Sequence, residues 1–550
     1  MKYYFLILLV SKFCLSYGQN KVNFSGGFES NAQWYLNDKQ LNVEHPEFPL
    51  RSNSYLLLNS NFKNFYTGVQ LESYNEKALL NFNPKYEKTN VATYFVQYKT
   101  SKIDLTAGYF YEQFGSGLLL RTWEDRQLGL NNALRGGRII FKPTDYCTLK
   151  TIYGQQRSGF NVSNGKIYGA DVEIQLSKIL KFEKNDLFIG GTFVGRDEQI
   201  QTTPLGFLNL TTAFGARINY SGTAFYISSE FNFKSDDPVV EFGKVQYNFI
   251  KPGTALLLNV GYVKKGFGVD ASFRRLENMS FFSDRLAKGN QFNDKILNFL
   301  PSLTKQHHTN LANIYVYQSQ PNVSITDELI SKSGEIGGQV DVFYTIKKNT
   351  IFGGKHGTKV AFNFSNWYGL KGIYIIETPR NYTTDFLGFN KKYFTDYNLE
   401  ITKKWNSKWS SVLTYINQFY NKKLVEETFG QVNTNIVAAE GTYKFANAKS
   451  VRILGEHMWA DSDKKNWVSA TIEVNLNANL SVFGTDLYNY GNEIQEARNH
   501  YYNFGGTYRK NASRLSISYG RQRGGLLCVG GVCRFVPESS GVSLSLNTSF

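Results

Sequence analysis

The sequence predicts an all-β fold, a transmembrane antiparallel β-barrel of about 24 strands (between about 22 and 26) with long extracellular loops. Three observations support this prediction. Aromatic residues make up 16% of the chain, with 36 Tyr and 43 Phe, and they lie in short runs that alternate apolar and polar residues. No run approaches the roughly 18 apolar residues of a membrane-spanning helix. The connections between runs alternate short and long, as they do in barrels with short periplasmic turns and longer outer loops.

The first 18 residues predict a secretory signal peptide. Lys2 precedes a short apolar stretch, and the small residues Ser16 and Gly18 stand before Gln19. A positive charge, an apolar run and small residues in that order are typical of a signal sequence, here cleaved after Gly18. We therefore expect the mature chain, 19–550, to form a single barrel domain, since it has only 11 Pro and no linker-like stretch.

The end of the chain shows the strand pattern clearly. Val542, Leu544 and Leu546 alternate with Ser543 and Ser545, and neighbouring side chains of a strand point to opposite faces, so this strand has an apolar and a polar face. A β-sandwich would also alternate, but it has no reason to keep short and long connections in phase along the chain. The expected strands are 21–36, 54–64, 65–74, 91–100, 102–115, 134–143, 146–158, 166–177, 186–196, 209–220, 222–234, 254–264, 266–277, 333–347, 357–369, 394–405, 407–420, 433–446, 449–460, 465–476, 477–490, 500–510, 512–523 and 539–550.

The longest connection is 278–332, and the other long ones include 37–53, 75–90, 116–133, 235–253, 370–393 and 524–538. Segment 278–332 is too long for a simple loop and contains apolar groups of its own. Because a barrel of this size encloses a wide lumen, we expect 278–332 to plug or cover the pore. With both chain ends on the periplasmic side, the strand number must be even.

Cys528 and Cys533 flank the residues VGGV in the last long connection. We expect this connection to lie outside the cell, where a disulfide between the two cysteines can form and persist. A metal site is the alternative, but zinc requires three or four protein ligands. The six His residues, at positions 45, 307, 308, 356, 457 and 500, show no ligand spacing. We therefore predict the disulfide and no metal.

The stretch 109–138, YFYEQFGSGLLLRTWEDRQLGLNNALRGGR, concentrates charges around glycines and one Trp. Loops of this kind often carry function, and this one is interpreted as a mouth loop that narrows the pore or forms an anion- or sugar-binding rim. The alternative is a solvated loop whose charges pair locally. Residues 118–130 could form a short amphipathic helix. The candidate residues are Glu112, Arg121, Trp123, Glu124, Asp125, Arg126, Arg135 and Arg138.

Charged residues on the polar faces of the strands are expected to line the lumen, because charge on the lipid face of a barrel costs about 2–4 kcal/mol at the midplane. Their mixed signs argue against a pore that strongly selects one sign of ion. The alternative is a salt-bridged wall that supports an internal plug. The candidate residues are Asp171, Glu173, Arg217, Asp341, Glu440 and Glu473.

Motifs of enzymes such as GxSxG, HExxH or a phosphate-binding loop are absent from the sequence, so we expect neither catalysis nor a cofactor. The pI near 9.3 could indicate nucleic acid. In an outer membrane, however, the anionic partner of a basic chain is lipopolysaccharide phosphate or acidic polysaccharide. The expected partners are therefore outer-membrane lipid and lipopolysaccharide, with an envelope protein as a further candidate.

The segments YFYEQFGSGLLLR (109–121), LRGGR (134–138) and LLCVGGVCRFVP (526–537) resemble an outer-membrane family of Bacteroidota described as a domain of unknown function. The resemblance covers most of the mature chain. It implies a barrel in a Gram-negative outer membrane and supplies no activity and no site residues. Two functions remain: a pore or transporter for small solutes, or a barrel scaffold whose loops bind envelope or secretion-machinery partners.

Overall fold

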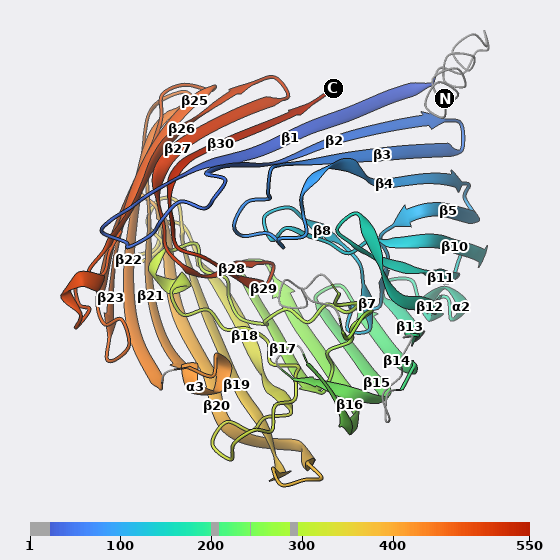
Figure 1. Cartoon of the computed structure of the whole chain (residues 1–550). Helices are drawn as coiled ribbons and strands as arrows, with labels where there is room; N and C mark the ends of the chain where they lie inside the picture. Colours follow the sequence, from blue (N-terminus) through green and yellow to red (C-terminus); the bar gives the residue numbers. More distant parts are fainter. Residues whose placement is uncertain (1–21, 200–207, 242–243, 287–294, 429) are drawn as a thin grey trace.

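A computed structural model describes residues 22–199, 208–241, 244–286, 295–428 and 430–550. The predicted signal peptide, 1–18, lies outside the described residues. Twenty-four antiparallel strands form one sheet that closes on itself, because the first strand pairs with the last from Gly27 opposite Ser549 to Leu36 opposite Ser540. The ring of strands is seen in Figure 1. The predicted transmembrane antiparallel β-barrel is confirmed.

The barrel strands are β1 (Asn23–Leu36), β2 (Leu50–Phe62), β3 (Phe65–Asn75), β4 (Lys88–Lys99), β5 (Ile103–Phe110), β10 (Leu134–Thr144), β11 (Cys147–Ser158), β12 (Asn161–Gln175), β13 (Asp186–Asp197), β14 (Leu210–Ser221), β15 (Phe225–Glu241), β16 (Lys244–Lys264), β17 (Phe267–Glu277), β18 (Gly334–Ile346), β19 (Thr358–Ile375), β20 (Asn381–Lys404), β21 (Trp409–Asn421), β22 (Gln431–Ala446), β23 (Lys449–Ala460), β24 (Trp467–Asn475), β25 (Leu480–Tyr488), β26 (His500–Lys510), β27 (Ser513–Gln522) and β30 (Ser539–Ser549). Short strand pairs in the connections are β6 (Gln113–Phe114) with β7 (Leu120–Arg121), β8 (Glu124–Asp125) with β9 (Leu130–Asn131), and β28 (Gly525–Val529) with β29 (Val532–Val536).

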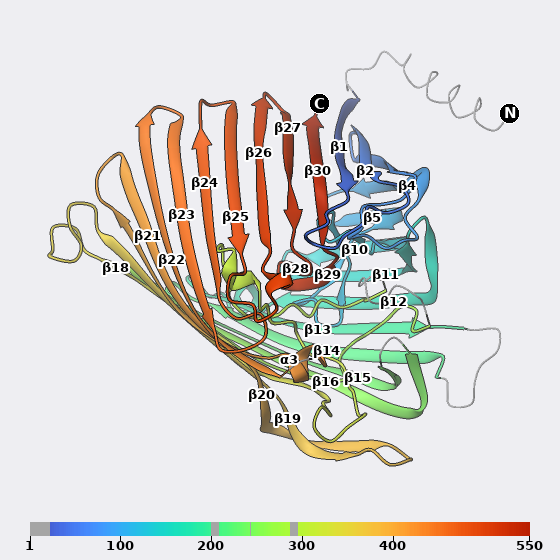
Figure 2. The same ribbon diagram turned by 60° about the vertical axis from the view of Figure 1, so that its left-hand side comes forward.

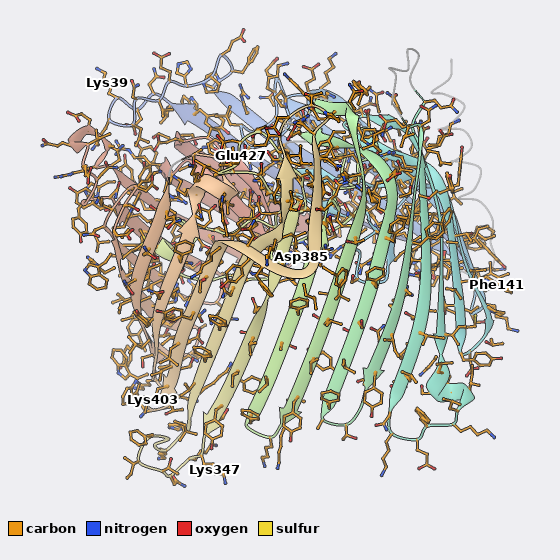
Figure 3. The ribbon with its side chains drawn as sticks, turned by 90° about the horizontal axis from the view of Figure 1, so that it is seen from below. Lys39, Phe141, Lys347, Asp385, Lys403 and Glu427 are labelled. Atoms are coloured by element: carbon orange, nitrogen blue, oxygen red, sulfur yellow. A yellow bond between two sulfur atoms is a disulfide. The ribbon has the colours of Figure 1, made fainter. Side chains whose placement is uncertain are left out.

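The two ends of the barrel differ in their connections. One end, which we call the turn end, carries short turns such as 222–224 and 511–512. The start of β1 and the end of β30 lie at the same end. The other end, the loop end, carries the long connections. Figure 3 shows Lys347 and Lys403 at the turn end and Lys39 and Glu427 at the loop end. Figure 2 shows the start of β1 and the end of β30 side by side at the turn end, where the two strands pair.

The outer face of the wall is apolar. Ile139, Phe214 and Ile472 are 49%, 51% and 47% exposed, while strand residues of the opposite parity are polar or covered. Aromatic rings at the turn end form neighbouring pairs, such as Tyr262 with Phe267 at 6.3 Å and Trp409 with Tyr443 at 4.7 Å. An apolar band bordered by an aromatic girdle is what a lipid bilayer requires of a barrel surface.

Several strands run farther than the sequence predicted. Segments 235–253 and 370–393 were expected to be loops, but β15, β16, β19 and β20 continue through most of them. The β20 register against β19 jumps from Phe389 to Thr384, so Asp385–Gly388 bulges out over the outer wall, where Figure 3 places Asp385. The bulge covers charges on the lipid-facing side: the Arg275 guanidinium pairs with Glu277 at 2.5 Å and lies 4.6 Å from the Phe386 ring.

The helix expected over 118–130 is wrong, because this stretch forms the short strands β7, β8 and β9. Leu118, Leu119 and Leu120 are all at most 2% exposed. Three consecutive side chains point in widely different directions on a helix, so one helical face cannot bury all of them. The helices are α2 (Leu176–Ile179), α3 (Lys422–Val425), η2 (Leu311–Asn313) and η3 (Gln495–Ala497). Within the described ranges, none combines the length and apolar character that crossing a bilayer requires.

Candidate functional site

Three connections fold into the lumen and meet there. They are the inner segment, residues 278–333 between β17 and β18, the mouth loop, residues 111–133 between β5 and β10, and the tail hairpin, residues 523–538 between β27 and β30. In Figure 1 the labels β7, β8, β28 and β29 all lie inside the ring of strands. The lumen contents are therefore parts of this same chain.

The inner segment and the mouth loop share an apolar core with one side of the wall. Phe281 and Leu297 of the inner segment pack with Leu118, Leu119 and Leu120 of the mouth loop. Backbone hydrogen bonds join the two segments, from Arg121 N to Leu297 O at 2.8 Å and from Phe299 N to Gly117 O at 2.9 Å. The wall contributes inward apolar side chains, all at most 5% exposed: Ile152, Ile167, Val194, Ala213, Ala255 and Leu276.

The second half of the inner segment packs against the opposite side of the wall. Tyr317 is fully buried and stacks between Trp367 and Phe394, with ring centroids at 5.9 and 5.3 Å. The carboxylate of Glu456 on β23 accepts hydrogen bonds from the Asn310 and Leu311 amides at 3.0 and 2.9 Å. The inner segment thus bridges the lumen between distant strands.

A buried ion cluster fixes the first half of the inner segment. The Arg285 guanidinium pairs with Glu198 and with Asp237, each at 2.8 Å, and Asp237 also pairs with Arg196. Burial lowers the pKa of Arg285, and burial raises the pKa of the Glu198 carboxyl although the two arginines beside it oppose the rise. Desolvation thus opposes both charges, so removing one partner would leave a costly unpaired charge.

Glu335 fixes the second half. Its carboxylate is fully buried and accepts from Arg274 at 2.6 Å, from the Tyr317 hydroxyl at 2.6 Å and from the Gln320 amide at 2.7 Å. Charge-assisted bonds of this kind are short and strong. One wall carboxylate therefore holds both the aromatic packing residue and the backbone of the inner segment.

The charges of the mouth loop pair with the wall. Arg126 binds Glu29 of β1 at 2.8 Å and Glu124 at 3.2 Å, while Asp125 accepts from the Leu128 amide. Glu112 pairs with Lys150 at 2.8 Å. These contacts agree with the reading of locally paired charges, and they hold the loop across the lumen.

Two residues assigned to the mouth loop lie on β10 instead. Arg138 points inward and pairs with Asp104 at 3.3 Å. Arg135 has the opposite parity and is exposed with the outward positions of β10, so its placement in the pore mouth is wrong. The charged stretch 109–138 extends from the mouth loop into β10. Because side chains alternate between the two faces of a strand, positions 135 and 138 face opposite sides.

The structure contains the predicted disulfide between Cys528 and Cys533, which joins β28 to β29. The hairpin does not project outward as expected but folds into the lumen onto the inner segment, where Ser302 N donates to Gly531 O at 2.9 Å. A Cβ on Gly531 would lie 2.7 Å from Ser302 O, and the φ of Gly531, +79°, also favours glycine. The disulfide-bonded hairpin thus contacts the inner segment through a glycine at its tip.

The predicted lumen-wall residues all lie on strands. Arg217 joins Asp171 at 2.6 Å and Glu173 at 3.2 Å, and Arg452 joins Glu440 at 2.8 Å and Glu473 at 3.1 Å. Asp341 accepts from Asn363 at 2.7 Å. The charges around Arg217 and Arg452 thus form ion-paired networks, as the alternative of a salt-bridged wall expects, whereas Asp341 lies opposite Asp270 of β17. Sequence reasoning missed the buried residues Glu198, Arg285 and Glu335.

Two cavities lie beside the tail hairpin. The first, about 220 Å³, is lined by all three inward connections, and the second, about 240 Å³, lies between the hairpin, the inner segment and β20–β21. Cys533 lines the first and Cys528 the second. In the described part of the chain, no three His, Cys, Asp or Glu side chains gather as metal ligands would.

The fold and the lumen define a class: a transmembrane β-barrel whose lumen is occupied by its own connections. The chain belongs to the family of unknown function DUF6029, whose model matches residues 1–550. No curated protein matches the chain.

Solved barrels resemble the chain only distantly. The siderophore receptor PirA from Pseudomonas aeruginosa is 8% identical over 97% of this chain and 81% of its own, with a TM-score of 0.43. The P pilus usher PapC translocation pore is 8% identical over 96% and 99%, with a TM-score of 0.41. A BenF-like porin from Pseudomonas fluorescens Pf-5 is 8% identical over 97% and 98%, with a TM-score of 0.36. Such scores carry no argument about function, so function is argued from the chain's own residues.

Proposed function

We propose that this protein is a gated pore for small solutes in the outer membrane of a Gram-negative cell. The observation that carries the proposal is the inner segment, which occupies the lumen yet enters and leaves the wall at neighbouring points, since Glu277 and Gly334 are paired across β17 and β18. A segment attached in this way can move without breaking the wall. Long loops at one end and short turns at the other support an outward-facing loop end, and the resemblance to a Bacteroidota family supports the same envelope.

The decisive experiment replaces residues 278–333 with a short Gly-Ser turn between the paired ends and records conductance in planar bilayers. The intact chain is expected to conduct little and the variant to give stable, large conductance steps, because the apolar core that fills the lumen is gone. The matched control shortens 489–499, the connection between β25 and β26, and should behave as the intact chain does. A silent variant that still folds as a barrel would contradict the pore.

A barrel scaffold for an envelope partner is the second candidate. The turn 347–357 exposes Ile351 and Phe352 at 93% and 75% beside Lys347 and Lys348. Adjacent exposed apolar side chains often mark an interaction site, and the turn end faces the periplasm in the proposed orientation. Silence of the variant without the inner segment would favour this role. The proposed lipid partner is lipopolysaccharide, whose anionic phosphates complement the excess of Lys and Arg.

A further inference from the structure

The cavity lined by the three inward connections differs in charge from much of the lumen around it. Ion pairs line several parts of the wall, but none of the described residues that line this cavity is charged. The lining instead combines aromatic rings, amides and hydroxyls. A surface without charge offers an ionic ligand no partner of opposite sign to offset the water that the ligand loses on binding. The residues that decide its chemistry are Trp123, Phe282, Phe299, Gln318, Ser319 and Asn322.

Two aromatic rings of the cavity are held rigidly. Trp123 of the mouth loop and Phe299 of the inner segment meet edge to face, with centroids 5.4 Å apart. The Arg121 guanidinium, which does not line the cavity, lies 3.9 Å from the Phe299 centroid and 5.4 Å from that of Trp123. Cation–π contacts of this kind fix ring orientation. The cavity therefore offers preformed aromatic surface.

Two amides of the lining have hydrogen-bonding capacity to spare. The Gln318 side chain makes no hydrogen bond among the described residues, and Asn322 uses only its oxygen, as acceptor from Ser280. The amides of Asn132 and Asn298, by contrast, are engaged with backbone groups. A side-chain amide has both hydrogen-bond donors and an acceptor. Gln318 and Asn322 can therefore donate a hydrogen bond to a ligand hydroxyl group or accept one from it.

We propose that this cavity binds a neutral, hydroxyl-rich ligand, a saccharide unit. Its C–H face would pack on the Trp123 and Phe299 rings while its hydroxyls pair with Gln318 and Asn322. At about 220 Å³ the cavity is smaller than the roughly 300–1,000 Å³ of pockets for drug-sized ligands, which fits a single sugar ring. The binding of a saccharide to this cavity does not depend on the proposed pore. A role of that binding in selecting the transported solute does rest on the proposed pore.

The test measures binding to the full-length chain in detergent by saturation-transfer NMR and calorimetry. The probes are D-glucose, D-galactose, N-acetyl-D-glucosamine and the anionic D-glucuronate. At least one neutral sugar should bind and D-glucuronate should not. Gln318→Leu and Asn322→Leu should each weaken binding about tenfold, the size expected for a lost hydrogen bond. The control, Gln306→Leu, changes an amide of the second cavity and should bind as the unmodified chain does.

The proposal is overturned if no neutral sugar binds, if D-glucuronate binds as well as the neutral sugars, or if Gln306→Leu weakens binding as much as Gln318→Leu. Failure of the pore is separate. If the chain binds sugar but does not conduct after replacement of 278–333, the sugar site is supported and the pore is contradicted. If that variant conducts but the chain binds no sugar, the pore is supported and the sugar site is contradicted.

Discussion

Two sides of the barrel wall meet the lumen in different ways. On β12, β13 and β14 the inward residues Ile167, Val194 and Ala213 are fully buried under the inward connections. On β27 and β30 the inward residues Ser516 and Ser545 are half-buried. Ser516 hydrogen-bonds Thr507 at 2.9 Å, and Ser545 donates to Asn31 at 2.7 Å. The first side is a protein core turned inward, and the second is a polar, water-compatible surface.

The contrast between the two sides indicates where a solute path can form. An inward apolar wall is stable only when protein covers it, since its exposure to water costs about 25 cal/mol per Å². A wall of hydroxyls and amides needs no cover. We therefore expect solutes to pass along the side formed by β25–β27, β30 and β1, with the covered side acting as the anchor of the inner segment.

The largest expected effect comes from breaking the anchor on the covered side. Glu335→Ala would leave the Arg274 guanidinium buried without its carboxylate, which costs about 3–5 kcal/mol. The inner-segment amides should then exchange hydrogen far faster in mass-spectrometric exchange. Glu473→Ala is the control, because the Glu473 side chain is 48% exposed and its loss should leave exchange unchanged. Equal exchange in both variants would show that Glu335 is no anchor.

The tail hairpin should give a medium effect. Replacing Cys528 and Cys533 together with Ser removes a cross-link around a very short loop, worth about 2 kcal/mol in the chain-entropy model. We expect the tail hairpin to become protease-sensitive in a limited digestion while the barrel stays folded. Cys147→Ser, which changes the one other cysteine among the described residues, should have no effect on the digestion. Resistance of the double variant would mean that packing alone holds the hairpin.

A charge substitution, for which we expect the smallest effect, tests where the solute path lies. In the chain with 278–333 replaced, Ser516→Asp adds a negative charge on the uncovered side. A charge near a passing ion in water is worth about 1 kcal/mol, so the cation-to-anion permeability ratio should rise about fivefold. Ser516→Asn keeps the size without the charge and should leave the ratio as it was. An unchanged ratio in both variants would place the path elsewhere.

Much of the wall could be predicted from the sequence. Alternation determines which side of a strand each residue faces. The prediction that Val542 and Ser543 face opposite sides, as do Val172 and Asp171, is therefore correct. The cysteine spacing predicted the disulfide. Strand ends were less predictable, since β19 and β20 extend through residues that show no clean alternation once they leave the bilayer and pack on protein, as Tyr382 does against Phe249 at 6.1 Å.

The alternation of apolar and polar residues, with its period of two, was enough to predict a closed, lipid-facing barrel, because lipid accepts only an apolar face. Contacts in the folded chain were needed to show which connections turn inward, that Arg135 faces out while Arg138 faces in, and that an uncharged cavity forms where three separate connections meet. Facing depends on neighbours along one strand, whereas the filling of a lumen depends on contacts between residues such as Arg121 and Phe299, or Ser302 and Gly531, that are far apart in the chain.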